Sequence, residues 1–110
     1  MNDFFAQQRE WDERASQVQA AAAQAYNRLL LLAENREGGQ ARTVAQFVAS
    51  TYNSHDHRFD LVDLRAVDVG ISDDMLVCLD ALRWGRADLC TLVPDGDRRT
   101  QRICADWGLN

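Results

Sequence analysis

The first third of the chain contains no residue that would break a helix. From Asp3 to Asn35 there is no proline and no glycine, and the segment is rich in alanine, glutamine, glutamate, arginine and leucine. These residues have high helix propensity. The sequence therefore predicts one long helix over residues 3–35, and this helix restricts the rest of the chain to elements that can pack along its side.

This predicted helix carries a heptad repeat of apolar residues. Trp11, Ala15, Val18, Ala22, Ala25, Leu29 and Leu32 are separated alternately by four and three residues, and Phe4 extends the series by one heptad. Such spacing gives an apolar seam along one face of a helix. Two interpretations stay open: the seam packs on its own domain, or residues 4–32 form a homodimer with a second copy. Phe4, Phe5 and Trp11 lie near the N-terminus and are predicted to anchor a partner.

Residues 59–82 combine the longest apolar run with most of the excess negative charge. Because Met75–Leu79 is apolar without interruption, we expect a central helix over 72–84 that is surrounded by other elements. Ser72 is its expected N-cap, and Gly85 is its expected end. Before this helix the sequence suits either a short strand or a helical turn over Asp60–Arg65 capped by Asp60, of which we favour the helical turn, followed by a bend at Gly70.

The remaining segments predict two further helices. The apolar spacing of Ala41, Val44, Ala45, Val48 and Tyr52 predicts a helix over residues 40–53, after a turn at Gly38 and Gly39. A last helix is expected over 98–107, capped by Asp97, with Ile103, Cys104 and Trp107 on its inner face. Residues 86–93 suit either a short strand or a helical turn.

The predicted fold is an all-α small helical bundle with a long N-terminal helix and room for one very short β segment. Its length of 110 residues predicts a single domain, with a helical extension at 1–24 and a core at 25–110. The sequence contains no apolar run of 18 residues, so no membrane span is predicted, and it contains no signal-peptide pattern. We therefore expect a cytoplasmic protein. Cys78, Cys90 and Cys104 are odd in number and widely spaced, which fits buried thiols in a reducing compartment.

The charge pattern favours a protein partner. The net charge is −5, and the seven aspartates and two arginines between residues 56 and 80 account for all of it. Such an acidic chain disfavours direct nucleic-acid binding, which depends on phosphate neutralisation. An acidic surface would instead suit a partner with a basic surface. Its expected residues are Asp60, Asp63, Asp68, Asp73 and Asp74.

Chemistry-bearing motifs are missing from the sequence. No GxSxG, P-loop or GxGxxG pattern occurs, so no catalytic residue is predicted and the expected function is non-enzymatic. His55 and His57 form an HxH pair in a polar loop without a third ligand, so no metal and no cofactor are predicted. Arg98, Arg99 and Arg102 are expected on the outer side of the last helix, where an alternative function would be regulation at a nucleic acid.

Three segments carry a family resemblance. GGQARTVAQFVASTYN (residues 38–53), FDLVDLRAVDVGISDDMLVCLDALRW (59–84) and ADWGL (105–109) together resemble a family of short uncharacterised bacterial proteins encoded on plasmids and integrative conjugative elements. The resemblance covers the chain from about Leu29 onwards. It implies an accessory role in a mobile genetic element and no catalytic residues.

Together, these observations lead to one functional expectation. We expect a protein-binding accessory protein that inhibits or regulates a host system through its acidic face. A nucleic-acid-targeting, CRISPR-like defence complex would present the basic surface that such a face requires.

Overall fold

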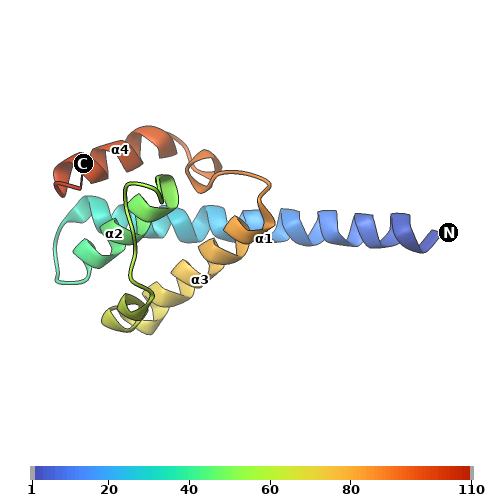
Figure 1. Cartoon of the computed structure of the whole chain (residues 1–110), viewed down its shortest axis with the longest axis horizontal. Helices are drawn as coiled ribbons and strands as arrows, with labels where there is room; N and C mark the ends of the chain where they lie inside the picture. Colours follow the sequence, from blue (N-terminus) through green and yellow to red (C-terminus); the bar gives the residue numbers. More distant parts are fainter. Residues whose placement is uncertain (1, 110) are drawn as a thin grey trace.

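α1 (Asn2–Asn35) forms the long axis of the molecule, and the other three α-helices pack beside its C-terminal part (Figure 1). The computed structural model describes residues 2–109, with principal extents of 54 × 27 × 23 Å. A helix of 34 residues is about 51 Å long, so α1 alone sets the longest dimension. Buried residues begin at Ala15, and the part of α1 before it extends beyond the rest of the protein as an arm.

The other elements are α2 (Ala41–Tyr52), α3 (Val69–Trp84) and α4 (Gly96–Asp106), with two 3₁₀ turns, η1 (Leu61–Ala66) and η2 (Leu89–Leu92). Within residues 2–109 there is no strand. The predicted all-α bundle is confirmed. The strand alternative for residues 86–93 is wrong, because this segment forms the η2 turn.

The core lies between the C-terminal half of α1 and the faces of α2, α3 and α4 that turn towards it. The largest fully buried side chains are Tyr26, Phe47, Leu29, Leu30, Met75 and Ile103. The predicted inner face of α2 is confirmed at Ala41, Val44, Ala45 and Val48. Phe47, which is outside the predicted set, also joins the core. It is 2% exposed and packs edge-on against Phe59, with ring centroids 5.3 Å apart.

The prediction of a central helix surrounded on all sides is wrong. α3 buries only one stripe, formed by Met75, Cys78 and Ala81, while Leu76 is 53% exposed. A chain of this length has too few elements to cover a helix completely, since much of a small domain's surface stays in contact with water. α1 and α2 supply most of the core instead.

The start of α3 also differs from the prediction. The helix begins at Val69, three residues before the expected cap, so Gly70 lies inside the helix and makes no bend there. The hydroxyl of Ser72 donates to the carbonyl oxygen of Val69 at 2.9 Å and caps nothing. The predicted end is confirmed, because Gly85 adopts a left-handed conformation with φ 67°.

Gly96, at the turn before α4, lies where there is no room for a side chain. Asp95 takes the left-handed conformation with φ 56°, whereas Gly96 is buried as the first residue of α4. A Cβ atom at position 96 would lie 1.9 Å from the carbonyl oxygen of Cys90. The predicted cap at Asp97 is wrong, since this residue lies inside the helix and accepts a hydrogen bond from Tyr52. The predicted cap of η1 is confirmed, because Asp60 accepts from the backbone N–H of Val62 at 3.0 Å.

Candidate functional site

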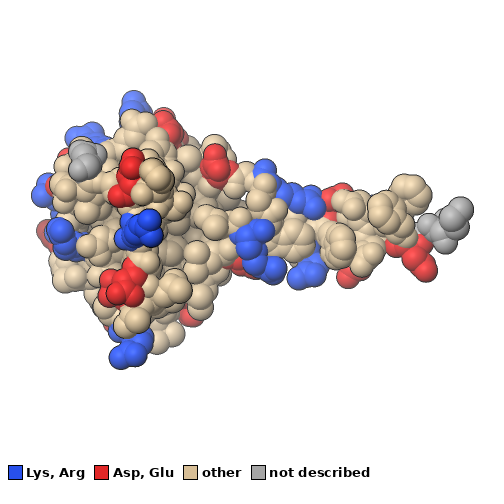
Figure 2. Space-filling model, viewed as in Figure 1, with Lys and Arg blue, Asp and Glu red and all other residues tan. Residues whose placement is uncertain are grey.

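The predicted acidic residues lie on η1 and the N-terminal part of α3, but two of them have partners within the chain. Asp74 accepts two hydrogen bonds from Arg28 of α1, at 2.8 and 3.0 Å. Asp68 accepts from the side-chain amide of Gln40 at 3.1 Å. For Asp63 and Asp73, no ion pair with an arginine occurs among residues 2–109. The acidic surface is therefore smaller than the sequence suggests, and Figure 2 shows acidic and basic side chains interspersed over the body of the molecule.

A shallow groove of about 840 Å³ separates the C-terminal end of α1 from the N-terminal end of α3. Its apolar side chains are Leu31, Leu32 and Ile71, of which Leu31 is 55% exposed. Arg28, Glu34, Asp68 and Asp74 are the charged residues that line it. Three acids and one arginine line the groove, but Asp74 pairs with Arg28 and Glu34 pairs with Arg99 of α4, so among residues 2–109 only Asp68 of these acids lacks an arginine partner. Sequence analysis named Asp68 and Asp74 but not Glu34, and it placed Leu32 in the heptad seam without predicting a groove, because the exposure of the leucines depends on where α3 crosses α1.

The predicted aromatic anchors lie far from this groove. Phe4 and Phe5 are 67% and 66% exposed, and Trp11 is 43% exposed. All three belong to the arm, and Trp11 precedes Leu31 by about 30 Å along the helix axis, at 1.5 Å per residue. The predicted partner-binding residues thus form two separate surfaces. Of the seam predicted over residues 4–32, Ala15, Ala22, Ala25 and Leu29 are buried within their own domain, so this part of the seam packs on its own domain in the single chain.

An arginine cluster surrounds Trp84 where the arm leaves the body. The guanidinium carbons of Arg14, Arg83 and Arg86 lie 5.4–5.8 Å from the centroid of the Trp84 ring. Arg86 also donates to Asp12 of α1 at 2.6 Å. These contacts fix the base of the arm to the C-terminal end of α3. Trp84 Nε1 is buried without a hydrogen-bond partner among the described residues. Sequence analysis did not single out this cluster.

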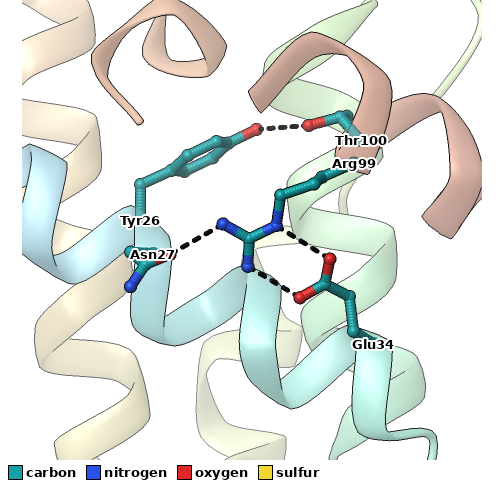
Figure 3. A network of polar contacts seen from close by, with 5 residues as sticks. All are labelled: Tyr26, Asn27, Glu34, Arg99 and Thr100. Atoms are coloured by element: carbon teal, nitrogen blue, oxygen red, sulfur yellow. Dashed lines mark hydrogen bonds and ion pairs between the residues drawn. The ribbon is translucent and has the colours of Figure 1, made fainter. Parts of the chain in front are cut away.

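The predicted outward arginine cluster of α4 is divided by the structure. Arg99 points inwards, where it donates to both carboxylate oxygens of Glu34 at 2.7 and 2.8 Å and to Asn27 at 2.8 Å (Figure 3). Beside it, the buried hydroxyls of Tyr26 and Thr100 lie 3.5 Å apart. Only Arg98 and Arg102 remain well exposed, at 79% and 82% of their side chains. The expected three-arginine surface is therefore wrong, and Arg99 joins α4 to α1.

The cysteines are poorly suited to nucleophilic chemistry. Burial raises the pKa of the Cys78 thiol to about 12, and burial also raises the pKa of Cys90 and of Cys104. A thiol reacts as its thiolate, so these side chains stay in the unreactive form near neutral pH.

Of the two histidines of the predicted HxH pair, only His57 lines a pocket. His55 is exposed, while His57 lines a pocket of about 550 Å³ together with Tyr52, Asp56 and Gln101. In that pocket the hydrogen bond from Tyr52 to Asp97 raises the pKa of Tyr52. Across residues 2–109, no group of three or more histidine, cysteine, aspartate or glutamate side chains is arranged to hold a metal ion.

A scan against protein-family models gives one match. The model described as a family of unknown function, DUF7673, aligns with residues 23–108. The chain belongs to this family. The region that the family model matches includes the groove, the whole of α2, α3 and α4, and the last third of α1. The arm, with Asp12–Arg14 at its base, lies before this region.

The other comparisons add no relative. Neither the curated proteins nor the solved structures include a significant match. Among residues 2–109, no helix combines the length and the apolar character that crossing a bilayer requires.

Proposed function

We propose that this protein is a non-enzymatic accessory protein that binds a basic segment of another protein in the groove between α1 and α3. The observation that supports the proposal most directly is the composition of the groove, where the apolar side chains of Leu31, Leu32 and Ile71 lie beside Asp68, an acid that no arginine of residues 2–109 neutralises. An amphipathic helix commonly binds by laying its apolar face into such a groove. A basic residue beside that apolar face would meet the carboxylate of Asp68.

The remaining acids support the same partner chemistry. Asp73 lies on α3 directly before the groove residue Asp74, while Asp60 and Asp63 belong to η1, which packs on α3, and no arginine of residues 2–109 pairs with these three. Complementary charge around a binding site accelerates encounter and orients the partner, with a smaller effect on the final affinity. We therefore assign these three residues to steering and the leucines to affinity.

The resemblance to proteins of mobile elements suggests the biological setting. In this proposal the partner is a host or element-encoded protein of a nucleic-acid-targeting complex, CRISPR-like defence complexes included. The support is chemical, because surfaces that hold nucleic acid are rich in lysine and arginine. A protein that covers such a surface would inhibit the complex. The non-enzymatic part of the proposal is supported by the raised pKa values of all three thiols.

Affinity capture with matched variants tests the proposal. Leu31→Arg places a bulky cation in the groove, and Leu76→Arg places the same residue at a leucine of similar exposure, 53% against 55%. Leu76 follows Asp74 by two residues and so lies about 200° away from it around α3. We expect proteins captured from bacterial lysate by wild-type beads to fall at least tenfold with Leu31→Arg and to persist with Leu76→Arg. Equal capture by both variants, or equal loss, would rule out the groove.

A further inference from the structure

The apolar face of the arm continues the core-facing stripe of α1 beyond the end of the body. Phe4 and Trp11 are seven residues apart and therefore lie within about 20° of each other around the helix. Ala22 and Leu29, a further eleven and eighteen residues along from Trp11, share this face and are buried. Phe4 and Trp11 thus continue the buried stripe of α1 onto the arm, where their side chains are exposed to solvent.

Asp3 and Arg14 are the charged residues nearest the two ends of the arm, and Arg9, Glu10, Asp12 and Glu13 lie between them. Asp3 lies in the first turn of α1, whereas Arg14 lies at the base beside Arg83 and Arg86. Figure 2 shows acidic side chains towards the outer end of the arm and a concentration of basic ones where it leaves the body. A partner that complements this surface has an acidic part that meets the arginines at the base of the arm, and apolar side chains that meet its aromatic residues.

We propose that the arm pairs antiparallel with the arm of a second copy, so that two chains form a two-fold symmetric dimer. Asp3 and Arg14 are eleven residues apart, close to three full turns, so both lie on the same side of α1. In a two-fold antiparallel pair, equivalent sides of the two helices face each other. Asp3 of each chain then meets Arg14 of the second copy, and Phe4 meets Trp11 of the second copy.

The Asp3–Arg14 and Phe4–Trp11 pairings are centred at nearly the same position along the arm. The midpoint of positions 3 and 14 lies between residues 8 and 9, and the midpoint of 4 and 11 lies between 7 and 8. One symmetry axis beside Gln8 therefore satisfies the charge pairing and the aromatic pairing together. A parallel pair would instead bring Asp3 against Asp3 and Arg14 against Arg14. The charge pattern favours the antiparallel arrangement.

The exposed area predicts a weak dimer. A fully buried aromatic side chain removes about 150–250 Å² from water, so the exposed fractions of Phe4, Phe5 and Trp11 correspond to roughly 350 Å² per chain. Two arms together give roughly 700 Å², below the 1,200–2,000 Å² of stable specific interfaces. We therefore expect a dissociation constant in the micromolar range or above it, with strong dependence on salt.

Analytical ultracentrifugation of the full chain tests this inference. Over roughly 5–500 μM protein at low salt, we expect a concentration-dependent shift from monomer to dimer, and half-molar salt should weaken it several-fold. Phe4→Ser combined with Trp11→Ser should abolish the dimer. A chain that stays monomeric at the highest concentration, or a dimer that survives this double substitution, would overturn the proposal.

A charge exchange tests the antiparallel arrangement. Asp3→Arg alone and Arg14→Asp alone should each weaken the dimer several-fold, and the two substitutions together should restore it. Arg9→Asp is the control, because Arg9 lies on the opposite side of the arm from Arg14, about 140° away. Circular dichroism of each variant checks that the helices remain. Failure of the double exchange to restore association would refute the pairing. The inference is independent of the groove, so neither experiment decides the other.

Discussion

Replacing Gly96 by alanine should destabilise the protein, although Gly96 lies in a helix where alanine is normally preferred. The added Cβ would lie 1.9 Å from the carbonyl oxygen of Cys90 and 2.8 Å from its carbonyl carbon. Ordinary contacts to a Cβ are 3.4 Å or longer, so the backbone of η2 would have to move by more than 1 Å. Overpacking a core costs about 1–3 kcal/mol, and displaced backbone places this change at the upper end.

The expected net effect follows from two opposing contributions. Alanine gains up to about 1 kcal/mol over glycine in a helix, which leaves a net loss of about 2–3 kcal/mol in the free energy of unfolding. With an unfolding entropy of about 2.1 cal/mol/K per residue, this corresponds to a melting temperature lower by roughly 9–13 °C. Thermal unfolding followed by circular dichroism at 222 nm measures it directly.

Gly70 provides the matched control for this prediction. It also lies in the first turn of a helix, but a Cβ at that position meets nothing within 4 Å. Gly70→Ala should therefore leave the melting temperature unchanged or raise it by a few degrees. If Gly96→Ala melts at or above the wild type, the close approach between α4 and η2 does not exist as described.

Three further predictions concern the interior. Arg99→Ala should lower the free energy of unfolding, measured by chemical denaturation, by about 1–3 kcal/mol, because Glu34 and Asn27 lose charge-assisted hydrogen bonds. The exposed Arg98→Ala is the control and should change it by less than about 0.5 kcal/mol. Equal effects of the two substitutions would contradict the role of Arg99 in joining α4 to α1. Tyr26→Phe should cost about 1 kcal/mol, since the phenol hydroxyl contacts Thr51 at 3.2 Å and Thr100 at 3.5 Å, and an unchanged urea midpoint would argue against these contacts. Burial raises the pKa of Cys78 from 9.0 to about 12, so its contribution to stability is complete below pH 9 and is lost as the pH rises from 9 to 12. Cys78→Val should make this alkaline loss smaller, and an identical pH profile for the variant would count against a buried thiol.

The fold could be predicted from the sequence where one signal dominated. The absence of glycine and proline between Asp3 and Asn35 predicted α1 to within one residue of its start, because nothing else in that stretch competes with helix. The apolar run at Met75–Leu79 gave a wrong packing prediction. Continuous apolar residues show that a segment can be buried, but the number of neighbouring elements decides how much of it is.

The candidate site was harder to predict, because it depends on contacts between distant parts of the chain. Arg28 and Asp74 are separated by 46 positions, and no local pattern indicates that one neutralises the other. The same holds for Arg99, whose neighbours Arg98 and Arg102 point to solvent while it pairs with Glu34 across 65 positions. The exposed aromatic residues of the arm could be recognised from sequence, since their neighbours in the chain are polar and the seam before Ala15 is sparse.

The continuity of α1 across the family boundary at residue 23 has a mechanical consequence. A helix without a hinge transmits rotation, so inserting one residue between Trp11 and Ala15 would turn the outer aromatic face by 100° and push it out by 1.5 Å. Inserting seven residues would lengthen α1 by about 10 Å and return the outer aromatic face to within 20° of its original direction. The helical residues before residue 23 are thus held at a defined angle relative to the part of the chain that the family model covers, and an insertion preserves this angle only where its length is close to a whole number of turns, such as about seven or eleven residues.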